Sequence, residues 1–312
     1  MKNKVNQMKI EKDMTVKQLA KAMSDSGVMG AGRIGKAVEV FEKILEEKQK
    51  NKKTGKEDCK LFFGLAGAMV PGGMKEIIHD MLISGTIDVF VTTGANLTHD
   101  LIEGLGYNHF KGNADVDDAE LNKKGIDRIY DSFMPNNVYE GLEGFFEKIF
   151  DELPKEMNIR ELLWEIGKRA PKNTILHICY EKQIPIFCPA ISDSGIGLMI
   201  WGNLEKGKKL KVDVFDDLKE ISRLAWDAKK PAVLYVGGGV PKNYIQQAMQ
   251  FSPNAAAFGI QITTDRVEPG GSSGAELREG ISWGKLNKNA LFADVRCDAT
   301  IALPLIWASV KK

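Results

Sequence analysis

AVLYVGGGVPK, residues 232–242, is the stretch of sequence that decides the fold. Five apolar residues run directly into three glycines, and Pro241 stands at the start of the segment that follows. This pattern predicts a buried strand, a tight turn and a helix, because proline is typical of a first helical turn. The bare backbone N–H groups of Gly237 and Gly238 would then be able to approach a pyrophosphate at the helix N-terminus. A tight turn without a ligand is the alternative interpretation.

The same pattern recurs along the chain, where short apolar runs alternate with amphipathic stretches that have helical spacing. This alternation predicts an α/β fold with a mainly parallel sheet and helices on both of its faces. Several of the runs end in glycine or a hydroxyl residue, as at Thr93 and Thr264. Ligands of open α/β sheets bind outside the carboxyl ends of the strands, so these ends outline a nucleotide-sized crevice. The other strand candidates are KLFFGLAG, IDVFVTTG, ILHICY, IPIFCPA, AAAFGIQI and LFADV.

A helical N-terminal arm precedes this pattern. VKQLAKAM and KAVEVFEKILEEKQK have helical spacing, and the polar stretch at 51–58 indicates a solvated linker. We therefore expect residues 1–58 to form the arm and linker and residues 59–312 to form one α/β domain. GAGRIG at 30–35 matches the dinucleotide-binding fingerprint, but a helix-like segment and a loop precede it in place of the required strand. We reject that interpretation.

Composition excludes several classes of function. Lys and Arg number 43 against 42 Asp and Glu, which leaves no net field for binding nucleic acid or a membrane. The N-terminus has no apolar targeting segment, and no run approaches the ~20 apolar residues of a spanning helix, so we expect a cytoplasmic protein. The cysteines are far apart and form no CxxC pair, which predicts reduced core thiols and no metal site. Cys297 is interpreted in the same way, as a small buried hydrophobe.

Lys285 closes GISWGK at 280–285, behind the indole of Trp283. A lysine is a nucleophile only when it is neutral, and burial beside an aromatic ring lowers the pKa of an amine. The alternative is a packed indole, a helix-ending glycine and a solvated lysine. His99 lies near a strand end beside Asp100 and is a candidate general acid or base, although a hydrogen-bonded structural histidine is the commoner case.

Two aspartates also follow predicted strands or precede an apolar helix. Asp193 comes after IPIFCPAIS, and Asp298 precedes ATIALPLIWA. Either carboxylate is suited to bind ribose hydroxyls. The alternative for both is a helix N-cap, which is the usual role of aspartate at such a junction.

Six segments in order give the chain a clear resemblance: GLAGAMVPGG, DVFVTTGANLTHDLIE, PAISDSGIG, VGGGVPK, GGSSGAELREGISWGK and DATIALPL. Together they resemble the deoxyhypusine synthase family, from about Met14 to the C-terminus, and SWGK is the most specific of them. The resemblance implies a Rossmann-like sheet, NAD as cofactor and a homotetramer with active sites between subunits. It implies that the enzyme oxidises spermidine with NAD and holds the aminobutyl fragment as an imine. The fragment would then pass to a lysine of the hypusine-containing translation factor and be reduced there.

The resemblance also assigns roles to residues. Lys285 would form the imine, Trp283 would be the wall against the polyamine methylenes, and Glu279 would hold a polyamine ammonium. The family's NAD site falls on Thr93, Asp193, Gly238, Thr264, Ser273 and Asp298, with Gly237 in the same turn.

The chain also departs from the family pattern. Leu198 and Ser272 replace acids, Asn243 replaces a histidine of the polyamine site, and His99 replaces a glutamate. Charge-assisted hydrogen bonds contribute roughly 1.5–3 kcal/mol each, so we expect a different grip on the amine. His99 would supply the proton transfer that other members obtain from their own histidine.

These departures leave alternatives open. A homospermidine synthase-like enzyme would transfer the aminobutyl group to a free diamine. A non-catalytic partner subunit would bind NAD without chemistry, although Lys285, Trp283 and Glu279 together argue against it. An NAD dehydrogenase with a lysine base is the most distant alternative.

Overall fold

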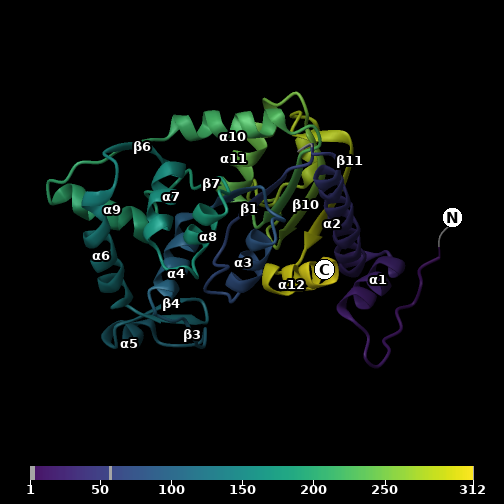
Figure 1. Cartoon of the computed structure of the whole chain (residues 1–312). Helices are drawn as coiled ribbons and strands as arrows, with labels where there is room; N and C mark the ends of the chain where they lie inside the picture. Colours follow the sequence, from purple (N-terminus) through teal and green to yellow (C-terminus); the bar gives the residue numbers. More distant parts are fainter. Residues whose placement is uncertain (1–3, 56–57, 312) are drawn as a thin grey trace. The chain divides into compact units, whose positions relative to one another are not determined.

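The computed structural model describes residues 4–55 and 58–311, and the chain divides into two compact units. The first unit contains residues 1–66, 86–91 and 218–312, and the second contains residues 67–85 and 92–217. Figure 1 labels the helices and strands of both units.

The first unit carries a parallel sheet and the helices that cover it. Its strands are β1 (Leu61–Leu65), β2 (Val89–Thr92), β9 (Ala232–Val236), β10 (Ala256–Thr263) and β11 (Leu286–Arg296). Its helices are α1 (Val16–Ser26), α2 (Met29–Thr54), α10 (Phe215–Asp227), α11 (Gly239–Gln250), the 3-10 helix η2 (Leu277–Ile281) and α12 (Ala299–Val310).

The strand order in this unit is β11-β10-β9-β1-β2, and β1 pairs in parallel with β9, β9 with β10, and β10 with β11. The chain therefore builds outward from β1 to β2 and later returns to place β9 on the other side of β1. Such a reversal separates the loops that follow β1 and β9, and it marks the place where α/β sheets bind ligands. The sequence prediction of a Rossmann-like, mainly parallel sheet is confirmed.

Burial explains why these segments are strands. Every residue of β1 and β9 is buried, as expected of central parallel strands that are covered on both faces. α2 and α12 pack on β10, and α11 packs on β1. Gly64 allows α11 to approach, because a Cβ there would lie 2.9 Å from the Tyr235 ring and 3.2 Å from Ile245.

The predicted N-terminal arm is helical, as expected. Thr15 caps α1 with a capping box, Gly27 ends it at φ +70°, and Phe41 of α2 packs on Trp307 of α12 at 5.9 Å between ring centroids. GAGRIG lies within the first turns of α2, so the rejection of the fingerprint is confirmed. α2 continues to Thr54, into the stretch expected to be linker, and residues 56–57 of that stretch lie outside the described residues. The division into residues 1–58 and 59–312 stays a prediction.

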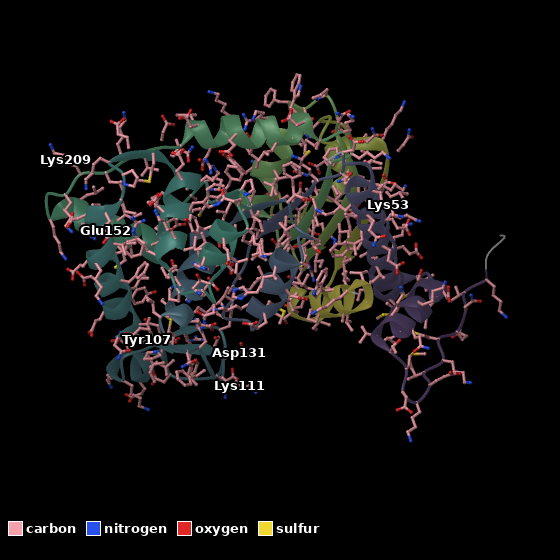
Figure 2. The ribbon with its side chains drawn as sticks, viewed as in Figure 1. Lys53, Tyr107, Lys111, Asp131, Glu152 and Lys209 are labelled. Carbon is pink, nitrogen blue, oxygen red and sulfur yellow. The ribbon has the colours of Figure 1, made fainter. Side chains whose placement is uncertain are left out.

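The second unit is mostly helical. Its helices are α3 (Lys75–Ile83), α4 (Gly94–Gly104), α5 (Asp118–Lys123), α6 (Val138–Ile149), the 3-10 helix η1 (Phe150–Glu152), α7 (Ile159–Arg169), α8 (Ile175–Glu181) and α9 (Gly195–Glu205). Its strands are β3 (Phe110–Lys111), β4 (Ile126–Ile129), β5 (Ser132–Pro135), β6 (Glu156–Asn158), β7 (Ile186–Phe187) and β8 (Lys211–Asp213). β3, β5 and β4 form a small antiparallel sheet, where Lys111 and Asp131 are labelled in Figure 2.

One predicted strand is wrong. ILHICY forms α8, which Thr174 caps by accepting a hydrogen bond from the backbone N–H of His177. The run is apolar on too many positions for its period to distinguish a buried helix from a buried strand, and the capping threonine was the overlooked signal.

The remaining composition-based expectations concern cysteines and membranes. All four cysteines are free thiols; Cys59, Cys179 and Cys188 are buried, while Cys297 is only half-buried. Within residues 4–55 and 58–311, the structure contains no helix with the length and apolar character needed to cross a membrane.

Candidate active site

A cavity of about 360 Å³ opens in the first unit beside α11, η2 and the start of β11. Four residues that the sequence predicted as site residues line it: Asn243, Glu279, Trp283 and Lys285. They come from two segments about 40 positions apart in the chain. Folding therefore brings α11 and the GISWGK segment to one cavity.

Lys285 lines this cavity, and its ammonium nitrogen lies 4.8 Å from the centre of the Trp283 ring. The turn is fixed by a hydrogen bond from Lys285 N–H to the Gly280 carbonyl oxygen (2.8 Å), and Gly284 takes φ +70°. Lys285 is half-buried and Trp283 is 56% exposed. The expected contact of indole and amine is present, but the expected burial by the indole is incomplete within this chain.

A second lysine, Lys242, also lines the cavity and was not predicted from the sequence. Lys242, in the first turn of α11, is 1% exposed. Its ammonium donates to the side-chain oxygen of Gln261 (2.9 Å) and to the carbonyl oxygens of Ser272 (2.5 Å) and Ala275 (2.7 Å). Burial lowers the pKa of Lys242 to about 8, against the opposing influence of Asp294 and Glu279. In the sequence, VPK looks like an ordinary helix start, and nothing there distinguishes a buried lysine from a solvated one.

Two further side chains fix the loop that forms the cavity wall. Gln261 of β10 donates to the carbonyl oxygen of Ser273 at 2.8 Å, and Arg296 of β11 donates to that of Gly274 at 2.9 Å. Together with Lys242, they hold residues 272–275 by the backbone. The wall that carries Ser272 and Ser273 is therefore set by the buried side chains of Lys242 and Gln261 and by the half-buried side chain of Arg296.

Several residues predicted to bind the cofactor lie at one edge of the sheet. Gly237, Thr264 and Asp298 follow β9, β10 and β11, which are adjacent and parallel, so all three stand at the carboxyl ends. Asp298 is the N-cap of α12, since its carboxylate accepts from Thr300 N–H at 2.8 Å. The capping role weighed for Asp298 is confirmed, and its role toward ribose stays a prediction.

The glycine turn after β9 suits a dinucleotide. Gly237 takes φ +70°, and a Cβ on Gly238 would lie 2.2 Å from the Cα of Ser273, so a side chain there would displace the loop. Among the described residues, no side chain caps the N-terminus of α11, a helix of 12 residues. Its first backbone N–H groups are therefore left directed toward the carboxyl edge of the sheet. The described residues therefore fit a pyrophosphate group at this turn.

The other three predicted site residues belong to the second unit. Thr93 is the N-cap of α4 and accepts from Asn96 N–H at 3.4 Å. Asp193 is exposed and does not cap α9, because Ser194 occupies the cap position and accepts from Gly197 N–H at 3.1 Å. The capping alternative for Asp193 is therefore wrong.

His99 of α4 does not contact the acid beside it in sequence. Its Nδ1 lies 2.9 Å from Nε2 of His109, and Nδ1 of His109 lies 2.7 Å from the carboxylate of Glu103. Asp100 instead lies 3.3 Å from the Lys75 ammonium and accepts from Ile175 N–H at 2.6 Å. His109 was not predicted as a site residue from the sequence, and in the structure it is the direct partner of His99.

The fold and the cavity define a class: a Rossmann-like α/β protein with a dinucleotide-compatible glycine turn beside a lysine pocket. Residues 18–310 match the family model for deoxyhypusine synthase. The chain belongs to the deoxyhypusine synthase family, whose members are transferases.

Similar proteins agree with this assignment. The "Probable deoxyhypusine synthase" of Methanosarcina thermophila is 42% identical over 305 residues, covering 97% of this chain and 93% of that protein. "Probable deoxyhypusine synthase 1" of Archaeoglobus fulgidus is 39% identical over 308 residues, covering 98% and 97%.

Solved structures resemble this one in fold. The crystal structure of a candidate deoxyhypusine synthase from Entamoeba histolytica superposes with a TM-score of 0.62 at 20% identity, covering 95% of this chain and 93% of that one. The AgrE protein in complex with ornithine and NAD+ gives a TM-score of 0.52 at 12% identity, covering 88% and 33%.

Proposed function

We propose that this protein is an NAD-dependent aminobutyltransferase that takes the aminobutyl group from spermidine as an imine on Lys285. The acceptor is a lysine of the hypusine-containing translation factor. One observation carries the proposal: Lys285, Trp283 and Glu279, the residues that the family resemblance assigns to this chemistry, line a single cavity with Asn243. A non-catalytic subunit has no chemical need for that set.

NAD is the proposed cofactor, and it supplies hydride acceptance and return when bound. Gly237, Gly238 and the uncapped N-terminus of α11 would hold its pyrophosphate, with Ser273 against the turn. Thr264 and Asp298 stand at the same sheet edge, and Thr93 and Asp193 complete the proposed set. AgrE, a protein with a similar fold, has been crystallised with ornithine and NAD+.

The residues of this chain would act on the amine. The face of Trp283 packs against the methylene groups, and the exposed carboxylate of Glu279 pairs with a substrate ammonium. The Lys285 amine attacks the imine carbon of the oxidised donor; a new carbon–nitrogen bond forms, the old one breaks, and 1,3-diaminopropane leaves. The acceptor lysine repeats the exchange and frees Lys285.

A homotetramer with shared active sites is part of the proposal. Trp283 is 56% exposed and Leu198, which replaces a polyamine-site acid, is 54% exposed in one chain. Water must be excluded for an imine to survive, so a second copy is expected to cover Trp283. Light scattering and analytical ultracentrifugation test the assembly.

The experiment is borohydride trapping with NAD and labelled spermidine, followed by mass mapping of the adduct. We expect an aminobutyl group on Lys285 that moves to the translation factor when the factor is added. Lys285→Arg should abolish the adduct, while Lys288→Arg, at an exposed lysine of β11, should leave it intact. The absence of any adduct with spermidine or putrescine would contradict the proposal and favour a non-catalytic NAD-binding subunit.

A homospermidine synthase-like activity is the second candidate, and the cavity supplies a specific reason for it. Asn243 and Ser272 line the cavity without charge, where the resemblance places a histidine and an acid. With fewer charged side chains in the cavity, the amine substrate would be bound by different contacts. Transfer of the Lys285 adduct to putrescine but not to the factor would establish this activity in place of the first.

A further inference from the structure

The candidate for proton transfer, His99, is a poor base by itself. Burial, and then the neighbouring His109, lower the pKa of His99 to about 4. An imidazolium at this position would be desolvated and would lie against a second ring whose centre is 4.9 Å away. The proposed oxidation of an amine to an imine nevertheless releases an N–H proton, which must be accepted near neutral pH.

The hydrogen bonds around His99 determine where its ring proton lies. An ionised carboxylate only accepts hydrogen bonds. Burial alone would raise the pKa of Glu103, but the hydrogen bond from His109 and the charge of Lys75 outweigh burial and hold that pKa below its ordinary value. The 2.7 Å contact therefore requires a proton on Nδ1 of His109.

Two proton arrangements satisfy the next contact, the 2.9 Å bond between the histidines. When His109 is neutral, its Nε2 accepts, so Nδ1 of His99 carries the proton and Nε2 of His99 has a free lone pair. When His109 is an imidazolium, its Nε2 donates, so Nδ1 of His99 accepts and Nε2 of His99 carries the proton. His99 is neutral in both arrangements, and among the described residues its Nε2 has no hydrogen-bond partner.

We propose that His99, His109 and Glu103 form a proton relay in which His99 Nε2 takes up a proton and His109 stores it. The proton enters at Nε2 of His99, the proton on Nδ1 of His99 crosses to Nε2 of His109, and the positive charge comes to rest beside the Glu103 carboxylate. At His99, the Nε2–H bond forms and the Nδ1–H bond breaks. At His109, the Nε2–H bond forms while the Nδ1–H bond is kept, so His109 becomes the imidazolium. His109 and Glu103 are thus positioning residues that act through His99.

Charged neighbours support this direction of transfer. The Lys75 ammonium lies 3.5 Å from the second oxygen of Glu103 and 3.3 Å from Asp100, and Asp100 lies 3.2 Å from Nε2 of His79. Lys75 keeps Glu103 ionised, while Asp100 balances the lysine. The positive charge stored on His109 therefore lies beside a carboxylate that has its own fixed counter-ion, and only 7% of the His109 side chain is exposed to solvent.

The relay rests on the proposed function only for the source of its proton, so the first test needs no activity. Protein with 15N-labelled histidine rings is titrated by NMR, and the four histidines are assigned with single variants. As the pH falls, the two ring nitrogens of His99 should exchange protonated and unprotonated character in the same step in which His109 gains its second proton. If His99 nitrogens keep their character while His109 titrates, the relay is refuted.

Isosteric substitution of Glu103, the carboxylate beside the stored charge, gives a second readout. In Glu103→Gln, the Lys75 ammonium donates to the amide oxygen, so the amide N–H₂ group faces His109. The His109 imidazolium then has no carboxylate beside it to stabilise its charge. The relay step should move to lower pH and Glu103→Asp should restore it in part. Glu76→Gln, at an exposed acid 3.9 Å from His79, is the matched control and should leave the step in place.

Kinetics then connect the relay to turnover. His99→Gln and His109→Gln should each lower kcat by ~100-fold or more, with little further loss in the double variant, because the residues act as a unit. Borohydride reduction with butanal, which needs no amine oxidation, should still label Lys285 in both variants. Loss of that label would place the defect in the imine pocket and refute the assignment of His109 to proton transfer. Absence of spermidine turnover in the wild-type protein would instead refute the proposed function, and the NMR titration would then decide the relay by itself.

Discussion

Replacing the buried Lys242 by methionine should change how the stability of the protein depends on pH. In the folded state, burial lowers the pKa of this ammonium from 10.5 to about 8. Between these pH values the unfolded chain still holds the proton that the folded chain has released, so wild-type stability rises with pH. Each pKa unit corresponds to about 1.4 kcal/mol, so the group contributes a rise of about 3 kcal/mol across that window.

Lys242→Met also removes three hydrogen-bond donors. The oxygens of Gln261, Ser272 and Ala275 lose the ammonium as partner, which costs about 1–3 kcal/mol for each buried group that stays unsatisfied. Below pH 8 the variant also avoids burying a charged ammonium, which offsets about 3 kcal/mol of the cost of the unsatisfied oxygens. We expect a net loss of about 2 kcal/mol at pH 7 that grows to about 5 kcal/mol at pH 10.5.

Urea unfolding followed by tryptophan fluorescence at pH 7, 8.5 and 10 measures both quantities. The decisive value is the difference in unfolding free energy between wild type and variant, since other titrating groups cancel in it. Lys219→Met, at an exposed position of α10, is the control and should run parallel to wild type. A wild-type curve parallel to that of Lys242→Met would refute the reasoning, because the buried amine would then titrate at its ordinary pKa.

Three further predictions concern the turn, the second unit and the thiols. Gly238→Ala places a methyl group against the backbone of Ser273, so it should weaken NAD binding in calorimetry and cost about 1–3 kcal/mol of stability in urea unfolding. Gly202→Ala is the control, because its Cβ would meet open space, and it should change neither quantity. Asp100→Asn removes a fully buried carboxylate from a lysine and a histidine and should cost about 3–5 kcal/mol; a loss below 1 kcal/mol in urea would contradict the pairing. A maleimide pulse on native protein, followed by mass mapping, should label Cys297 first, because burial raises the thiol pKa values of the other three cysteines; equal labelling of all four would count against this.

Local patterns were enough to predict much of the fold. The apolar runs at β1, β2, β9 and β10 are strands because each is short, buried and bounded by glycine or hydroxyl residues. The two helices of the arm and the Asp298-capped α12 were predicted from spacing and caps. ILHICY was predicted wrongly because a run of six mostly apolar residues is too short to distinguish the period of a helix from that of a strand. The small strands of residues 110–135 were missed, since two- to four-residue strands with exposed positions give no pattern.

The candidate site divides in the same way. The sequence by itself determined the α/β architecture and the glycine turn after β9, because strand burial and backbone freedom are written into neighbouring residues. A specific motif also predicted Lys285, Trp283 and Glu279 as site residues, and all three line one cavity. Only the tertiary structure decided that Lys242 is buried beneath three oxygens and that His99 pairs with His109 in place of Asp100. Burial and hydrogen-bond partners depend on groups that are distant along the chain. The pKa of a side chain follows from those partners, and no local pattern of residues specifies them.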